Sequence, residues 1–209
     1  LLGHHAQGGS ARVGREARAA QASAVAMASA SRAVRALCNA AMTGQIEQAR
    51  AAVAAGAIGT ECDPSSEDTM PLHVACQNCQ EEMAAWLIGR GVDVNISTVE
   101  TQMTALHTAS MVGYAPIVTL LIGSDADVTA VECEEMTPMH LACSFGHVET
   151  AQLLLDASAS LDAPTRTGRT PLHCAASKGE LVMVEWLHSS GATIDVPTAN
   201  LRRTALHVR

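Results

Sequence analysis

The sequence predicts an all-α solenoid built from helix–turn–helix units. The first observation is a motif centred on histidine that recurs at a nearly constant spacing of 34, 33, 33 and 34 residues, at His73, His107, His140, His173 and His207. The second is composition, because 48% of the chain is apolar but only 2% is aromatic. Ala, Leu, Val and Met therefore supply the apolar mass, which favours packed helices over a sheet sandwich.

Each unit reads as the same series of elements. Thr and Pro before the His give an N-cap and a first helical turn, so a short helix follows. A glycine then permits a left-handed turn into a second helix, such as HVETAQLLLDA at 147–157, which has apolar residues at helical spacing. A polar stretch of about a dozen residues leads to the next unit. The turn position six residues past the His holds Cys79, Gly113, Gly146 and Gly179. The position eighteen residues past it holds Gly91, Asp125, Ser158 and Gly191.

The chain divides near residue 36. Residues 1–35 are rich in Ala, Ser and Arg, with five Arg and one Glu, and we expect a poorly ordered or partly helical segment there. An organelle-targeting role for this segment stays open. Residues 36–209 hold five units, the first with Cys38 in the His position, plus the opening of a sixth. Because the sixth is unfinished and the chain begins at Leu1, we expect a piece of a longer protein.

The repeated motif identifies a family. MPLHVAC, TALHTAS, TPMHLAC, TPLHCAA and TALHVR follow one pattern, and with its period near 33 this pattern resembles the ankyrin repeat. The resemblance covers residues from about 36 to 203 and implies stacked antiparallel helix pairs joined by hairpin-like fingers. It also implies that the repeated His ties adjacent turns together. The first unit departs from the pattern because it lacks the T-P-L-H signature, and its finger, ECDPSSEDT, is slightly long.

The spacing C-x-x-C at Cys76 and Cys79 raises the alternative of a metal or redox site. Zinc needs four ligands, and the chain has no second C-x-x-C. Cys76 stands in a column of small residues and Cys79 in the glycine column, where a left-handed turn costs a side chain about 1–2 kcal/mol. Trp86 and Trp186 stand in a leucine column and are predicted to be core. No nucleotide-binding or hydrolase motif is present, so we predict no metal, cofactor or enzymatic activity.

Composition narrows the class of partner and the compartment. The net charge of −8 argues against nucleic acid as the main partner. No apolar run reaches the roughly 18 residues of a membrane span. Seven Cys without a secretory signal are read as reduced thiols, so we expect a cytoplasmic or nuclear protein.

The family resemblance places partner binding on the concave face, at the finger tips and the exposed end of each first helix. The positions that match are Met103, Met111, Val112, Glu134, Met136, Ser144, Phe145, Arg166, Arg169, Lys178 and Arg203. Five of them form a predicted apolar patch in the middle of the array, namely Met103, Met111, Val112, Met136 and Phe145. The alternative is that neighbouring fingers cover these side chains, or that they are scattered singly.

Finger charge changes sign along the chain. Early fingers carry Glu61, Asp63, Glu67, Asp68, Glu100, Glu132, Glu134 and Glu135, whereas later ones carry Arg166, Arg169, Arg202 and Arg203. We predict a partner whose charge also reverses, although any solvated loop carries charges.

The sequence therefore predicts a non-catalytic module that binds another protein or a peptide. One alternative is that the repeats are the targeting arm of a larger ankyrin-containing enzyme or channel, and another is that they only space or cap other parts.

Overall fold

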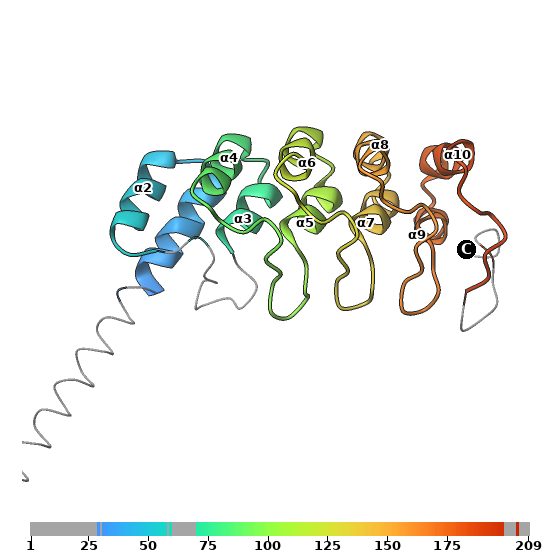
Figure 1. The fold of residues 1–209 in the computed structure, drawn as a ribbon, viewed down its shortest axis with the longest axis horizontal. Coiled ribbons are helices and arrows are strands. Elements are labelled where there is room, and N and C mark those ends of the chain that lie inside the picture. Colours follow the sequence, from blue (N-terminus) through green and yellow to red (C-terminus); the bar gives the residue numbers. More distant parts are fainter. Residues whose placement is uncertain (1–28, 30, 58, 60–69, 199–203, 205–209) are drawn as a thin grey trace, which may run out of the picture.

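The computed structural model describes residues 29, 31–57, 59, 70–198 and 204 of the chain. Their helices lie in two parallel rows, and the loops between successive units project to one side as fingers (Figure 1). Among the described residues no extended strand forms, and the pairing between Ser97 and Thr104 is an isolated antiparallel bridge. The predicted all-α solenoid is confirmed.

The inner row, in which each helix follows a finger, comprises α3 (Pro71–Gln77), α5 (Ala105–Val112), α7 (Pro138–Ser144) and α9 (Pro171–Lys178). The outer row comprises α4 (Glu81–Gly89), α6 (Ala115–Ile122), α8 (Val148–Asp156) and α10 (Leu181–Ser189). Before them, residues 31–43 are helical and are followed by α2 (Ile46–Ala54). None of the helices described is long and apolar enough to cross a membrane.

The first helical stretch crosses the boundary predicted at residue 36. Ala33 and Val34 are 4% and 2% exposed and belong to the same apolar cluster as the later repeats. The packed array therefore includes residues that precede the predicted boundary.

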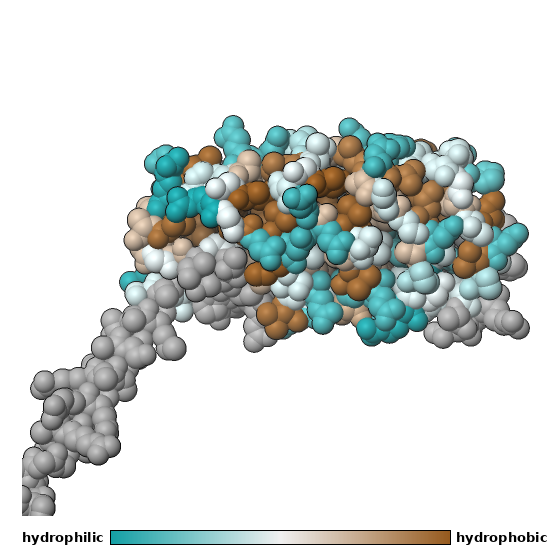
Figure 2. All heavy atoms as spheres, in the orientation of Figure 1, coloured by the Kyte–Doolittle hydropathy of each residue, from teal (hydrophilic) through white to brown (hydrophobic). Residues whose placement is uncertain are grey.

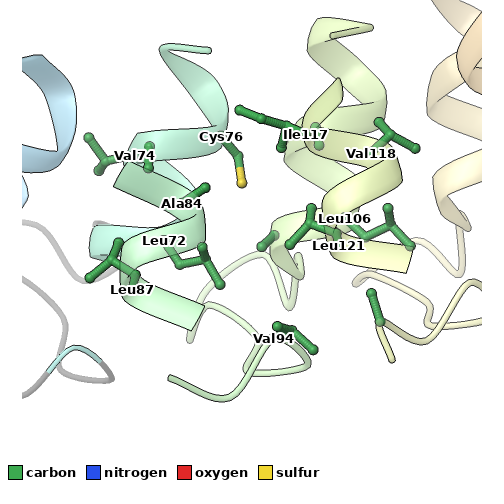
Figure 3. Packing of buried hydrophobic residues seen from close by; sticks show 14 of the residues in the cluster. Leu72, Val74, Cys76, Ala84, Leu87, Val94, Leu106, Ile117, Val118 and Leu121 are labelled. Carbon is green, nitrogen blue, oxygen red and sulfur yellow. The ribbon is translucent and has the colours of Figure 1, made fainter. Parts of the chain in front are cut away.

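Small side chains set the spacing of the inner row. Ala75, Ala109, Ala142 and Ala175 are completely buried and let successive inner helices approach closely. Larger side chains fill the space between the two rows, as Figure 3 shows for Leu72, Leu87, Leu106 and Leu121. Because each unit contributes the same positions, one continuous core runs through the array.

Three of the inner helices, α5, α7 and α9, begin at a threonine–histidine capping pair, whereas α3 begins at Met70 without a side-chain cap. In α5, the backbone N–H of His107 donates to Thr104 Oγ1 over 3.4 Å, and the Thr104 N–H donates to His107 Nδ1 over 3.2 Å. Thr137 with His140 and Thr170 with His173 repeat this reciprocal cap. Since Nδ1 accepts from a backbone N–H, the ring proton of these neutral histidines lies on Nε2.

That second ring nitrogen links successive units. The Nε2–H groups of His73, His107 and His140 donate to the carbonyl oxygens of Met103, Met136 and Arg169, over 2.9, 3.0 and 3.2 Å. Each carbonyl ends the finger of the following unit. The His column is therefore structural in these units, as the family resemblance implies.

The C-x-x-C pair is split between core and surface. Cys76 is fully buried, and Figure 3 shows its sulfur among apolar side chains. Burial, followed by the neighbouring Cys79, raises the pKa of the Cys76 thiol to about 12, so this thiol stays protonated at neutral pH. Cys79 is exposed in the turn after α3. Among the described residues, no group of three His, Cys, Asp or Glu side chains is placed to hold a metal.

The two tryptophans pack against the core but remain half-buried, so the prediction that they are core residues holds only in part. The Arg90 guanidinium lies 5.3 Å from the centre of the Trp86 ring. Trp186 Nε1 donates to Gln152 Oε1 over 3.3 Å. Each half-buried ring therefore contacts an exposed polar side chain, Trp86 through its face and Trp186 through its N–H.

The turn between the inner and outer helices requires a left-handed residue. Gly113, Gly146 and Gly179 have φ values of 79°, 73° and 79°, and Cys79 adopts φ 56° in the same column. We therefore expect Cys79→Gly to raise the free energy of unfolding by about 1 kcal/mol. Urea denaturation measures this change. Gly179→Ala is the opposite substitution and should lower the free energy of unfolding. A Cβ at Gly179 meets no atom within 4 Å, so this variant strains only the backbone. A loss of stability in Cys79→Gly would contradict this explanation.

Candidate partner-binding surface

Each described finger is closed by its own first residue. The N–H groups of Thr98, Glu132 and Thr165 donate to the carbonyl groups of Met103, Met136 and Arg169 over 2.9, 3.1 and 2.9 Å. In return, the Thr98 and Thr165 hydroxyl oxygens accept the N–H groups of Met103 and Arg169, each over 3.1 Å. These reciprocal bonds fix the finger bases, and the left-handed residues Gln102, Glu135 and Gly168 turn the chain just before each finger ends.

Glu132 closes its finger with a carboxylate, where the other two fingers use a threonine hydroxyl. Its Oε1 accepts the N–H groups of Glu134 and Met136 over 2.9 and 3.0 Å, and its Oε2 accepts the Cys133 thiol over 3.1 Å. The bond to Glu132 raises the pKa of Cys133. Glu132 is only 7% exposed, so it is a structural acceptor and not one of the surface charges of the early fingers.

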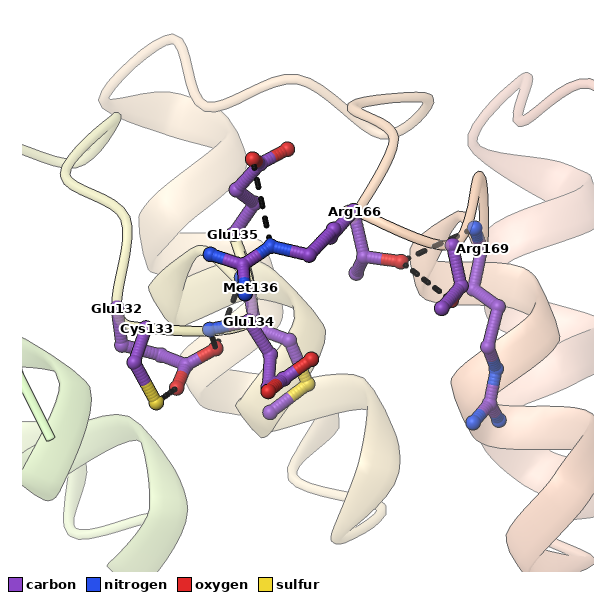
Figure 4. Close-up of polar contacts among 9 residues, drawn as sticks. Glu132, Cys133, Glu134, Glu135, Met136, Arg166 and Arg169 are labelled. Carbon is purple, nitrogen blue, oxygen red and sulfur yellow. Dashed lines mark hydrogen bonds and ion pairs between the residues drawn. The ribbon is translucent and has the colours of Figure 1, made fainter. Parts of the chain in front are cut away.

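Neighbouring fingers are also joined to each other. The Cys133 N–H donates to the Thr101 carbonyl over 3.0 Å, and the Arg166 N–H donates to the Glu134 carbonyl over 3.1 Å. Figure 4 shows Arg166 reaching back to Glu135, with 3.7 Å between Nε and Oε1. Both side chains are more than half exposed, so this ion pair contributes less than about 1 kcal/mol. The acidic and basic fingers therefore partly neutralise each other.

The polar residues predicted to bind a partner differ in availability. Glu134, Arg166 and Lys178 are exposed, and Ser144 is half-buried. Arg169 is held inside its own unit, because its Nη2 donates to Ser177 Oγ over 2.6 Å and to the His173 carbonyl over 3.3 Å. Several predicted residues lie outside the described part of the chain, namely Glu61, Asp63, Glu67, Asp68, Arg202 and Arg203.

The predicted apolar patch is exposed at one residue and partly covered at the others. Phe145 is 47% exposed, whereas Met103, Met111, Val112 and Met136 are half-buried. The prediction of open apolar side chains therefore holds for Phe145. For the other four, the alternative of covering neighbours applies in part.

Phe145 stands on a rigid support. It is the C-cap residue of α7, and its ring stacks on His147 with centroids 6.3 Å apart and planes inclined by 11°. His147 is held in turn by a hydrogen bond between Nε2 and the Met111 carbonyl, 3.1 Å long. Its ring fits against Gly113, where an added Cβ would collide with it. The support thus joins α5 to α7, and the Phe145 ring is presented with little freedom to lose on binding.

Three residues of this surface were missed from the sequence. His147 supports Phe145, while Val99 and Val131 are 69% and 50% exposed on neighbouring fingers. A signal for His147 exists, because the position after the turn glycine holds a long side chain in each unit, namely Gln80, Tyr114, His147 and Glu180. The two valines interrupt polar finger segments, which is also visible in the sequence.

Comparisons with known proteins agree with this geometry. A model described as ankyrin repeats in many copies matches residues 37–88 and 72–122, and one described as ankyrin repeats in three copies matches residues 106–200. NF-kappa-B inhibitor alpha from Sus scrofa is 37% identical over 99 residues. That match covers 44% of this chain and 30% of that protein. Ankyrin repeats in general mediate protein–protein interaction and are not themselves enzymatic. With the two models covering almost the whole helical array, the chain belongs to the ankyrin-repeat family.

Proposed function

We propose that this chain is a non-catalytic module that holds a partner protein on its inner face. By inner face we mean the finger ends and the ends of the inner helices, at Met103, Met111, Val112, Glu134, Met136, Ser144, Phe145, Arg166 and Lys178. The observation that carries the proposal is the exposed Phe145 ring on its His147 support.

The physical argument is one of preorganisation. A large apolar ring that is already fixed loses little conformational entropy when a partner covers it, so most of the burial energy appears as affinity. Half-buried methionines and Val112 on the same face supply adaptable apolar contacts around this anchor. The exposed charges of Glu134, Arg166 and Lys178 then select among partners by sign.

The similarity to an inhibitor protein supports a regulatory use of the surface. By its name, NF-kappa-B inhibitor alpha is an inhibitor of NF-kappa-B. We propose the same general mode here, in which the bound partner is covered and restrained and undergoes no chemical change. The identity of the partner does not follow from the shared fold.

Affinity capture tests the proposal. The full 209-residue chain is used as bait in wild-type, Phe145→Ala and Val182→Ala forms, and retained proteins are identified by mass spectrometry. Val182 is the matched control, because it is 71% exposed on α10 of the outer row. We expect a protein that wild type and Val182→Ala retain and that Phe145→Ala loses, with affinity reduced at least about tenfold. Capture that depends on Val182, or that ignores both changes, would contradict the proposal.

A further inference from the structure

A groove separate from the inner face runs between two fingers. It has a volume of about 500 Å³ and is lined by Ser97, Thr98, Val99, Gln102, Ala130 and Val131, among others. It shares no residue with the inner face defined above. Val99 and Val131 are 69% and 50% exposed, so each wall of the groove presents an aliphatic side chain to solvent. Figure 2 shows hydrophobic surface reaching the tip of the finger that precedes α5.

The walls of this groove are held in place by hydrogen bonds. Thr98 bonds to the backbone of Met103 in both directions, over 2.9 and 3.1 Å, and its hydroxyl lies 2.7 Å from that of Thr101. The Cys133 N–H joins the second finger to the first through the Thr101 carbonyl. The two valines are therefore presented at a fixed separation, and a ligand would not need to order the fingers.

The charge around the groove has a single sign. Residues 91–165 contain no Lys or Arg and ten Asp or Glu, at Asp93, Glu100, Asp125, Asp127, Glu132, Glu134, Glu135, Glu149, Asp156 and Asp162. Apart from the buried Glu132 and the half-buried Asp162, these side chains are exposed. Glu135 is paired with Arg166, but the block as a whole keeps a net negative charge, which attracts cationic ligands over several ångströms.

Two of these acidic residues, Asp93 and Asp127, are hydrogen-bonded to a residue that lines the groove. Asn95, which lines it, accepts the Asp127 N–H on Oδ1 over 2.7 Å, and its own N–H donates to Asp93 Oδ1 over 2.9 Å. Asp127 is oriented by two bonds from Thr129, over 2.8 and 2.7 Å. Glu100 follows Val99 directly on the first finger. Asp93 and Asp127 are therefore held next to the groove through Asn95.

From this juxtaposition, we propose that the groove binds an extended, Lys- and Arg-rich segment of the partner protein. An aliphatic side chain of that segment lies between Val99 and Val131, and the basic side chains next to it face Asp93 and Asp127. The assignment rests on the proposed function, since it takes the occupant to be part of a protein. It adds a second contact site and gives the chemistry of the segment bound there.

The test is direct binding of a synthetic probe. A fluorescein-labelled nonapeptide in which Lys alternates with Val is titrated with the full chain, and fluorescence anisotropy gives Kd at low salt. The counterpart peptide carries Glu in place of Lys. We expect the Lys peptide to bind at least about tenfold more tightly than the Glu peptide.

Matched variants separate the groove from general electrostatic attraction. Val99→Lys with Val131→Lys adds two positive charges in the groove, and Leu181→Lys with Val182→Lys adds the same charge at exposed positions of α10. We expect the groove pair to weaken Lys-peptide binding at least about tenfold and the α10 pair less than about twofold. Equal losses in the two pairs, or no preference for the Lys peptide, would overturn the assignment.

The same variants distinguish this inference from the proposed function. A partner whose capture is lost in Phe145→Ala but kept in the groove pair would leave the proposed function standing and remove the groove assignment. A partner weakened by both supports two contact sites. All four substituted positions of the two pairs are exposed, so each variant is expected to keep its urea midpoint, and a measured midpoint verifies this.

Discussion

Replacing His140 with leucine is expected to lower the free energy of unfolding by about 3 kcal/mol. Leucine fills much of the same volume, but it removes the acceptor for the Thr137 N–H and the donor to the Arg169 carbonyl. His140 is fully buried and Thr137 nearly so, so the groups left without a partner would lie away from solvent. Since the bond to the Arg169 carbonyl joins α7 to the following finger, part of the loss falls on the contact between two repeats.

Chemical denaturation monitored by circular dichroism measures this effect. His188→Leu is the control, because His188 is exposed in the last turn of α10 and its replacement should change stability by less than about 0.5 kcal/mol. Equal stability of the His140 and His188 variants would show that the histidine links contribute nothing beyond packing.

Acidification is expected to destabilise the array through the same histidines. Burial lowers the pKa of His140 from 6.5 to about 4, and it also lowers the pKa of His107. The unfolded chain therefore takes up protons between about pH 6.5 and 4 that the folded chain does not bind. The stability is complete above about pH 6.5 and falls as the pH drops toward 4, by about 3 kcal/mol for His140 alone.

Urea midpoints measured at pH 7, 5.5 and 4.5 test this dependence. The control is His140→Gln, which keeps a polar side chain but cannot titrate, so its stability should fall less steeply over the same interval. Midpoints that stay constant or rise on acidification would contradict the neutral, Nε2-protonated state assigned to these rings. The same slopes in wild type and variant would assign the pH dependence to other groups.

The repeat architecture could be predicted from the sequence because it depends on local rules. The Thr or Pro at the helix start, the left-handed turn and the spacing of apolar residues each act within one unit, and they recur from unit to unit. The left-handed turn at Cys79 was also predictable, because the other units have glycine in its column. The structure gives Cys79 a φ of 56°. The structural role of the repeated His was also predictable, since the same role had to apply to every copy of the repeat.

The state of individual surface residues could not be predicted, because it depends on side-chain contacts that the repeat pattern does not specify. Glu132 is an acidic residue in a finger, yet it is buried since its carboxylate replaces a threonine hydroxyl in closing the turn. Arg169 is a predicted binding residue whose guanidinium is bound to Ser177 of its own unit. The support of Phe145 by His147 depends on the empty space at Gly113, one unit earlier.

Structural and surface residues have separate roles in the array. The buried column of threonine and histidine consumes its hydrogen bonds internally, so the residues left to vary are those at the finger ends and helix ends. A rigid frame that presents variable positions is suited to recognition. Phe145 is the position at which this frame exposes the largest apolar surface on that face.

Hydrogen–deuterium exchange on the complex with a captured partner tests the central claim most directly. The account predicts slower amide exchange on binding at residues 98–103, 111–113, 132–136 and 144–147, with no change across α8 and α10. Protection confined to the outer row, centred on Leu181 and Val182, would contradict the claim and place the partner on the opposite side of the array.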